Sequence, residues 1–291
     1  MKPSRSTYLP VRGLSYHIRH WGSEDAPLIV MLHGWMDVSA SFQFLVDAFA
    51  RDWHVVAPDW RGFGLSEHAP GGYWYPDYLA DLEAILDHYS PHRPVILLGH
   101  SLGANVAGVY AGVRPQRIAK LIDIEGFGMP AAHPSQAPAR YAQWLDALKG
   151  QAGLRPYPTL QEVAARLQKT NPRLSDERAA FLARHWAQQR EDGRWHILAD
   201  AQHKLPNPVL YRLDEVLACW SGISAPVLWI EARGSELTAR LDAGQGARAE
   251  IDRRIAFMRN VTILMVDDAG HMVHHDRPEI LAGAIEAFLA R

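Results

Sequence analysis

The chain is poor in cysteine, in long apolar runs and in excess charge of either sign. Cys219 is the single cysteine among 291 residues, which excludes an internal disulfide and favours a reducing compartment. It lies in an apolar stretch, where a small buried side chain is a more natural role than a catalytic thiol. Lys and Arg number 30 against 32 Asp and Glu, and the basic residues are dispersed. This balance predicts neither nucleic acid nor an anionic membrane as a partner.

Hydrophobic segments long enough to cross a membrane are also missing. No run approaches the roughly 18 apolar residues that a transmembrane helix needs. The N-terminal stretch MKPSRSTYLPVRG has basic residues but no apolar run behind them, which argues against a signal peptide. We therefore expect a cytoplasmic protein that acts on a small molecule. With 48% hydrophobic residues, the chain can bury one large core.

What is present is an alternation of short apolar runs with amphipathic segments, which predicts alternating strands and helices. Leu14–Trp21 mixes apolar and charged residues like a half-exposed strand, whereas Leu28–Leu32 is apolar throughout, like a strand buried on both faces. Further strands are expected at His54–Ala57, Pro94–Leu98, Lys120–Ile124, Val227–Ile230 and Val261–Val266. Helices are expected at Tyr78–Tyr89, Leu102–Val113, Ile251–Met258 and from Pro278 onward. This order implies parallel pairing with right-handed crossovers.

The alternation stops after Phe127 and resumes at Pro226. The intervening segment has no apolar run suited to the sheet, and helices are expected at Ala139–Lys149, Leu160–Lys169 and Asp176–Gln189. Thr159 and Glu162 have the spacing of a capping box, which suits the start of the second helix. The sequence thus predicts a core of residues 1–126 and 220–291 with a helical cap at 127–219. The aromatic side chains of the cap are expected mainly to hold its helices together; they are Tyr141, Trp144, Tyr157, Trp186, Trp195, Tyr211 and Trp220.

The first chemical motif is Gly99-His100-Ser101-Leu102-Gly103, which matches G-x-S-x-G. It lies between an apolar strand and a helix rich in small residues, as a nucleophile elbow requires. On such a sharp turn the hydroxyl projects above the sheet edge, and the two glycines leave room for a strained backbone. Ser101 is the predicted nucleophile. His100 is expected to point away from the hydroxyl and to pack beside it.

The second motif, His33-Gly34-Trp35, directly follows the strand Leu28–Leu32. In proteins with this elbow, the loop after that strand supplies one donor of the oxyanion hole, and the residue after the nucleophile supplies the other. The backbone N–H groups of Trp35 and Leu102 are therefore the predicted oxyanion donors. The side chains of Trp35 and His100 are the predicted substrate contacts.

A serine nucleophile also needs a general base, and histidine suits this role at neutral pH. Of the 15 histidines, His271 lies in the loop after the last strand, at the sheet edge where Ser101 is expected. His271, His274 and His275 form an H-x-x-H-H cluster, which raises the alternative of a metal site. Metal-binding pairs of this kind usually share a helix face, whereas Pro278 places this cluster before a helix. We expect no metal and no cofactor.

Four motifs together resemble the α/β-hydrolase superfamily: HGW at 33–35, DWRGFGLS at 59–66, GHSLG at 99–103 and AGHMVHHDRPE at 269–279. The chain is most similar to the small capped branch that includes esterases, epoxide hydrolases, haloalkane dehalogenases and serine-hydrolase-like proteins. The resemblance implies a mostly parallel eight-stranded sheet with helices on both faces and an inserted helical cap. Epoxide hydrolases and haloalkane dehalogenases carry aspartate in the elbow, whereas this chain has Ser101. The resemblance therefore implies an acyl-enzyme and cleavage of an ester, thioester, amide or C–C bond.

The acid of the triad is where the sequence departs from the family. The resemblance places an aspartate after Val227–Ile230, but the segment here is Glu231-Ala232-Arg233-Gly234-Ser235-Glu236. The other family position is the end of the preceding strand, which offers Glu125. We favour Glu125, because a carboxylate at a strand terminus within an apolar run needs a partner. Glu236, in a looser loop, is the alternative, and Asp123 ranks lower because it is out of the alternation that faces the site.

These residues predict a cofactor-independent serine hydrolase that acts on a small, apolar carboxylic ester. In this interpretation His271 activates Ser101, and an acyl-enzyme forms and is hydrolysed. Two alternatives stay open at this point. One is a cofactor-free dioxygenase or perhydrolase that uses the same triad, and the other is a non-enzymatic ligand receptor on this scaffold.

Overall fold

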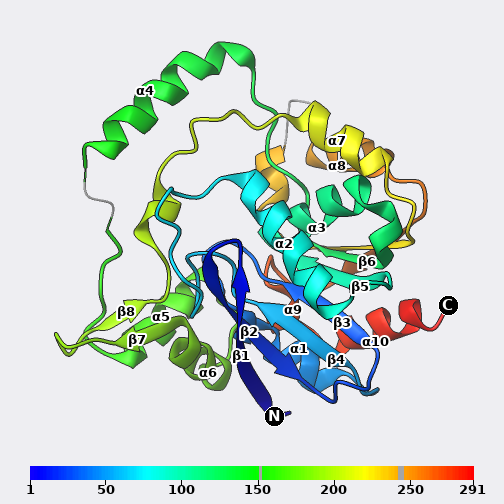
Figure 1. Ribbon diagram of the computed structural model, residues 1–291, viewed down its shortest axis with the longest axis horizontal. Coiled ribbons are helices and arrows are strands. Elements are labelled where there is room, and N and C mark those ends of the chain that lie inside the picture. Colours follow the sequence, from blue (N-terminus) through cyan, green and yellow to red (C-terminus); the bar gives the residue numbers. More distant parts are fainter. Residues whose placement is uncertain (151–152, 242–245) are drawn as a thin grey trace.

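A computed structural model describes residues 1–150, 153–241 and 246–291 (Figure 1). The strands of its main sheet are Ser4–Val11 (β1), Leu14–Trp21 (β2), Leu28–Leu32 (β3), His54–Pro58 (β4), Val95–His100 (β5), Ile118–Ile124 (β6), Val227–Ala232 (β9) and Val261–Val266 (β10). The eight strands lie in the order β1-β2-β4-β3-β5-β6-β9-β10. β1 and β2 are antiparallel at one edge, and from β4 onward all neighbours are parallel. The predicted fold class is confirmed.

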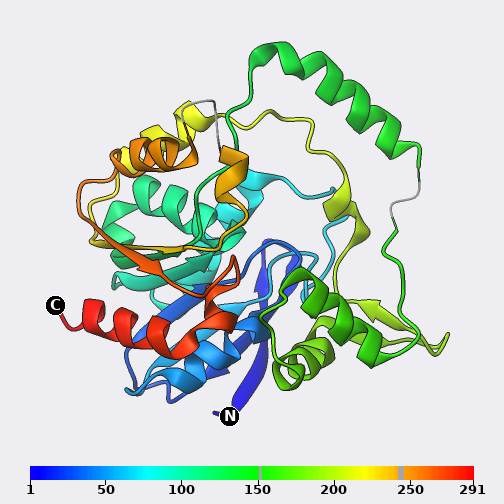
Figure 2. The same ribbon diagram turned by 180° about the vertical axis from the view of Figure 1, so that it is seen from behind.

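Helices cover both faces of the sheet (Figures 1 and 2). Their bounds are Gln43–Ala48 (α1), Tyr75–Tyr89 (α2), Leu102–Val113 (α3), Leu213–Ser221 (α7), Ala247–Ile255 (α8), Val273–Asp276 (α9) and Pro278–Leu289 (α10). The alternation of side chains along each strand divides the core into two clusters. In β3, Val30 and Leu32 pack with α2, α3, α7 and α8, whereas Ile29 and Met31 pack with α1, α9 and α10. The continuous apolar run of β3 thus serves both faces.

The boundaries of several elements differ from the predicted ones. Strand β1 was not predicted because its side chains are mostly exposed and show no apolar alternation. It is an edge strand held by pairing with β2. The helix predicted at Ile251–Met258 instead begins at Ala247 and ends at Ile255, and Met258 lies in the turn before β10. Local sequence is a weak guide to such ends, since a few polar residues extend a helix at little cost.

Among its described residues, the segment between β6 and α7 contains three α-helices, Ala137–Leu148 (α4), Leu160–Thr170 (α5) and Asp176–Trp186 (α6). Thr159 Oγ1 accepts a hydrogen bond from the Glu162 backbone N–H at 3.2 Å and caps α5. The prediction that the third helix continues to Gln189 is wrong, because Ala187–Gln189 (β7) pairs with Trp195–Ile197 (β8) in a separate hairpin. Its turn places Gly193 at φ 72°, a conformation that suits glycine.

Figure 1 shows α4 as an arm set apart from the rest of this segment, and none of its side chains is buried. In contrast, α5 and α6 pack against each other through small apolar clusters that also hold Phe44 of the core. The predicted core boundary at residue 220 falls inside α7, which packs against α3. Among the helices that the structure describes, none combines the length and apolarity needed to cross a membrane.

The motif at 59–66 forms a buried polar network beneath the HGW loop. The Asp59 carboxylate accepts hydrogen bonds from the backbone N–H of Ser39 at 2.6 Å and of Leu65 at 3.0 Å. His17 Nδ1 lies 2.7 Å from Asp59 Oδ2. A Cβ at Gly64 would lie 2.1 Å from that same oxygen, so only glycine fits there. This motif therefore fixes the backbone near the site, and the role of its buried polar side chains is structural.

Candidate active site

Ser101 lies on the turn between β5 and α3 with φ 53° and ψ −113°, a strained conformation for a residue with a side chain. Its backbone N–H donates to Ile124 O at 2.9 Å, which ties the turn to β6. A Cβ at Gly99 would lie 2.4 Å from Ala104 N, and one at Gly103 would lie 2.1 Å from Leu32 O. Both flanking positions of the motif are therefore restricted to glycine by close backbone contacts.

The HGW loop passes directly beside Ser101. A Cβ at Gly34 would lie 3.3 Å from Ser101 Cβ, so the loop and the nucleophile are in near contact. Buried His33 fixes the loop, because its Nε2 accepts from the Trp60 backbone N–H at 2.9 Å. From α6, Trp186 Nε1 donates to Met36 O at 2.7 Å. Trp35 and Ser101 line the same pocket, and Leu102 is the first residue of α3.

The loop after β10 carries His271, whose Nδ1 lies 3.1 Å from Glu125 Oε2. Glu125 follows β6, has φ 59° and is only 1% exposed. Its Oε1 accepts from the Ala232 backbone N–H at 2.7 Å, and its Oε2 accepts from the Ser235 hydroxyl. The buried carboxylate thus has two hydrogen-bond donors besides the imidazole, which compensate for the hydrogen bonds to water that it loses on burial. The sequence did not identify Ser235 as a partner, because it stands where the family carries the acid itself.

The other two candidate acids lie differently. Glu236 is exposed in the loop after β9, and within the described ranges it makes no ion pair with a histidine. Asp123 is buried, and its Oδ1 accepts from the Gly126 backbone N–H at 2.8 Å. Of the three carboxylates, the structure therefore brings only Glu125 to His271 among the residues it describes.

His100 is almost completely buried behind the site. Its Nε2 donates to His271 O at 2.9 Å, and its ring packs against the rings of His271 and His274. Burial lowers the pKa of His100 well below its usual value, so the ring is neutral. The side chain holds the backbone of His271 in place and also reaches the pocket wall.

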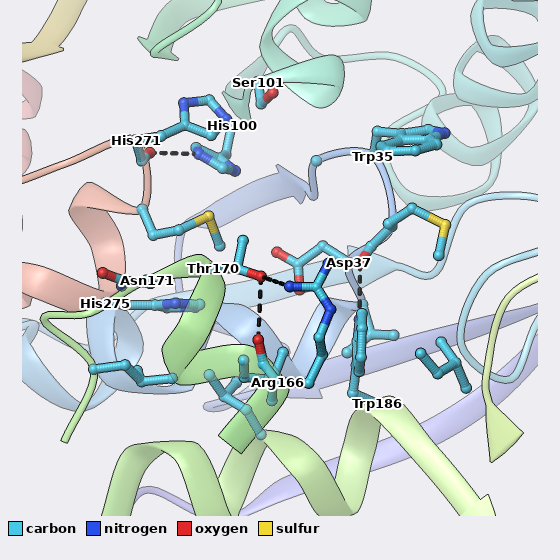
Figure 3. A pocket seen from close by; sticks show the side chains of 18 of the residues that line it. Trp35, Asp37, His100, Ser101, Arg166, Thr170, Asn171, Trp186, His271 and His275 are labelled. Atoms are coloured by element: carbon cyan, nitrogen blue, oxygen red, sulfur yellow. Dashed lines mark hydrogen bonds between the residues drawn. The ribbon is translucent and has the colours of Figure 1, made fainter. Parts of the chain in front are cut away.

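Ser101 and His271 lie at the same end of one pocket (Figure 3). Within residues 1–150, 153–241 and 246–291, no hydrogen bond joins the Ser101 hydroxyl to His271. Catalytic hydrogen bonds are often long in proteins without substrate and tighten in the complex. The His271 side chain is 26% exposed, and the residue lines the same pocket as Ser101.

The pocket has a volume of about 370 Å³ and lies between the loops after β3, β5 and β10 and the segment of residues 154–204. Its wall is mostly apolar and includes Trp35, which is 52% exposed, and Met36. Of the aromatic residues predicted for a cap, Tyr157 and Trp186 line the pocket. The others lie elsewhere: Trp220 is fully buried against Trp229, Trp144 contacts Trp74, Trp195 belongs to β8, Tyr141 is exposed on α4, and the hydroxyl of Tyr211 lies near Gly128.

One group of described side chains has ligand atoms close enough to hold a metal ion: Asp37, His274 and His275, all within 4.8 Å of one another. It differs from the H-x-x-H-H cluster of the sequence, because it does not include His271. The Ser41 hydroxyl already contacts both imidazoles, His274 Nε2 at 3.0 Å and His275 Nε2 at 2.7 Å. His274 Nδ1 and Asp37 Oδ2 are buried and have no hydrogen-bond partner among the described residues.

A further contact links the end of α5 to the loop of His271. Asn171, which directly follows α5, donates from Nδ2 to Asp276 Oδ1 at 2.7 Å. Asp276 Oδ2 accepts from the backbone N–H of Gly270 at 2.8 Å. Nothing in the sequence pointed to this bridge, since Asn171 and Asp276 are 105 positions apart. It ties the position of α5 to the residue just before His271.

Asp123 is expected to make folding stability depend on pH. Burial raises the pKa of its carboxyl to about 7, whereas an unfolded Asp titrates near about 3.9. Between these values the folded protein retains a proton that the unfolded chain has lost. The free energy of unfolding should therefore fall as pH rises from about 4 to about 7, by up to about 4 kcal/mol.

Asp123→Asn keeps an acceptor for Gly126 N and removes this titration. Urea unfolding between pH 5 and 8 should then show a smaller loss of stability with pH than in the wild type. Asp25→Asn, at an exposed position, is the control and should behave as the wild type. Equal pH slopes for the wild type and Asp123→Asn would rule out a buried proton on Asp123.

Comparison with known proteins agrees with this architecture. The family model of the α/β hydrolase fold matches residues 27–278. The chain belongs to the α/β-hydrolase superfamily. Among curated relatives, this α/β-hydrolase is 28% identical to a zebrafish (Danio rerio) serine hydrolase-like protein, over 92% of this chain and 83% of that one. It is 25% identical to the human (Homo sapiens) serine hydrolase-like protein 2, over 92% of this chain and 88% of that one.

Solved structures share the fold of this α/β-hydrolase. The thioesterase domain from the curacin biosynthetic pathway superposes with a TM-score of 0.83 at 24% identity, covering 98% of this chain and 99% of that one. At this identity the likeness concerns the fold. The family and its serine-hydrolase-like relatives identify the protein as a hydrolase of this superfamily.

Proposed function

We propose that the protein is a serine carboxylesterase with Ser101, His271 and Glu125 as its triad. The observation that carries this proposal is the contact of buried Glu125 with His271 in the same pocket as the strained Ser101. A nucleophile, a base and an orienting acid on three separate loops of one sheet edge are the parts that acyl transfer needs. The serine in the elbow also distinguishes this site from the sites of enzymes whose nucleophile is an aspartate carboxylate.

Each proton has a defined place in the proposed reaction. His271 Nδ1–H donates to Glu125, which leaves Nε2 free to accept the proton of Ser101 as its oxygen attacks the ester carbonyl. The backbone N–H groups of Trp35 and Leu102 donate to the resulting oxyanion. The imidazolium then protonates the departing alkoxide, leaving an acyl-Ser101. Water attacks this ester after His271 takes its proton, which releases the acid and restores the serine.

The surroundings of the triad support this assignment of roles. The three donors on Glu125 fix its carboxylate, and His100 fixes the backbone of His271, so little reorganisation is needed during the reaction. Residues 127–219 form the proposed cap, which roofs the pocket through α5 and α6 and brings Trp186 to its wall. A pocket of about 370 Å³ suits a small substrate with an apolar body, in which Trp35 and His100 are the proposed contacts.

The proposal is tested by labelling and turnover on the intact protein. A fluorophosphonate probe should modify one serine, and peptide mass spectrometry should locate the adduct at Ser101. A panel of p-nitrophenyl esters of graded acyl length should be hydrolysed with an optimum at short to medium chains. Ser235, the other serine of the triad region, should remain unmodified because the residue is only 8% exposed and its hydroxyl is bonded to Glu125. A folded protein that resists the probe and hydrolyses no ester would overturn the proposal.

A further inference from the structure

The wall of the catalytic pocket is more basic than the chain as a whole. The chain carries slightly more acidic than basic residues, yet the pocket is lined by Arg155, Arg166 and Lys204 against Asp37 as its one acid. These three basic residues come from separate segments, namely the loop before α5, α5 itself and the 3-10 helix Ala201–Lys204. Their convergence on one cavity gives it a local positive potential that the net charge does not predict.

None of the three cations is neutralised by a carboxylate. Among the residues that the structure describes, no Asp or Glu oxygen lies within 4.0 Å of the charged nitrogens of Arg155, Arg166 or Lys204. By contrast, Arg178 of the neighbouring helix pairs with Glu279 at 3.6 Å. All three residues are exposed where they line the pocket, and without a carboxylate partner their charges are available for an anionic ligand.

Arg166 is the best positioned of the three. Its Nη1 donates to Thr170 Oγ1 at 2.6 Å, and that hydroxyl donates to Arg166 O at 3.2 Å. Figure 3 shows the side chain rising from α5 into the pocket toward Asp37, with Ser101 and His271 farther along the same direction. The bond to Thr170 holds one edge of the guanidinium at the exposed wall of the pocket. A fixed, planar donor set suits a carboxylate or a similar oxyanion.

We propose that the pocket selects esters whose acyl chain ends in an anionic group, with Arg166 as the principal contact and Arg155 and Lys204 beside it. This inference rests on the proposed esterase function and specifies its substrate class. Apolar side chains such as Leu167, Trp186 and Ile197 line the same cavity and suit the methylene part of such a chain. The substrate class is thus an ester with an apolar middle and an anionic end opposite the scissile carbonyl.

The test compares three p-nitrophenyl esters of matched length: the monoester of adipic acid, the adipamic acid ester and the hexanoate. They differ only in a terminal carboxylate, carboxamide or methyl group. We expect kcat/KM of the wild type to be at least tenfold higher for the carboxylate than for either neutral ester. The preference should weaken in 0.5 M NaCl, because exposed charges are screened within a few ångströms at such salt.

Variants locate the source of the preference. Arg166→Gln should lower the ratio of kcat/KM for the carboxylate ester to kcat/KM for hexanoate about tenfold, mainly through KM for the carboxylate ester. Arg166→Lys should keep part of this preference. Arg140→Gln removes a charge from exposed α4, outside the pocket, and should change nothing. Hexanoate and adipate hydrolysed equally well, or a preference unaffected by Arg166→Gln, would overturn this inference and leave the esterase proposal intact. If the wild type hydrolysed none of the three esters and also resisted the fluorophosphonate probe, the esterase proposal would be overturned and this inference with it.

Discussion

Ser101→Ala should lower kcat for p-nitrophenyl ester hydrolysis by about 10⁴-fold or more, to the level that the pocket and the oxyanion donors sustain alone. Without the hydroxyl there is no acyl-enzyme, so labelling by the fluorophosphonate should be lost as well. The residual rate should show no burst of p-nitrophenol, since a burst reports a covalent intermediate. Steady-state and stopped-flow absorbance measure both quantities.

The loss should not come from unfolding. Among the described residues, the Ser101 hydroxyl has no hydrogen-bond partner, so its removal takes away no bond that stabilises the fold. The thermal midpoint of Ser101→Ala should match that of the wild type. Ser221→Ala, on the exposed end of α7, controls for a serine deletion elsewhere and should retain full activity. If Ser101→Ala kept more than about a tenth of the rate, the nucleophile would have to be another group.

The elbow was predictable from the sequence because its constraints are local. Gly99 and Gly103 are needed because the backbone of α3 closely approaches β5 and β3 at these positions. This packing requires two glycines at a fixed spacing, which can be recognised in the sequence as the G-x-S-x-G motif. The buried strands were predictable for a similar reason, since β3 and β5 must be apolar on both faces. His271 followed from its place after the last strand. These inferences needed only short-range pattern and the order of elements.

Other features depend on contacts between distant parts of the chain, which no local pattern records. Strand β1 is stabilised by pairing with β2 rather than by burial. Gln189 lies outside the predicted helix because it pairs with β8 as part of β7. The contact of Ser235 with Glu125 links positions 110 residues apart. The basic lining of the pocket likewise comes from three segments whose charges are unremarkable in sequence.

The choice between Glu125 and Glu236 shows this limit most directly. Glu125 stands at a strand end and Glu236 in the loop after a strand, and residue type alone does not distinguish them. In the structure, Glu125 has φ 59°, its backbone N–H donates to Ile230 O at 2.9 Å, and its side chain contacts His271. The mutational prediction for these two residues is therefore the sharpest test of the proposed triad.

Glu125→Gln should lower kcat by about 10³- to 10⁴-fold, with little change in KM. The Ala232 N–H requires an acceptor, so the carbonyl oxygen of the glutamine should take the place of Oε1. The amide NH₂ then faces Ser235 and His271, where a carboxylate oxygen accepted before. An N–H donor at that place favours the imidazole tautomer with its proton on Nε2, which cannot accept the proton of Ser101.

Glu236→Gln is the matched control, because it makes the same chemical change on the exposed loop after β9. It should alter kcat by less than about twofold, as surface substitutions away from a site usually do. Probe labelling should follow the same order, with Ser101 reacting slowly in Glu125→Gln and normally in Glu236→Gln. Circular dichroism and the thermal midpoint separate a catalytic loss from a folding defect, since Glu125 is buried. A large loss in Glu236→Gln together with a normal rate in Glu125→Gln would reverse the assignment and require the β9 loop to move toward His271 when substrate binds.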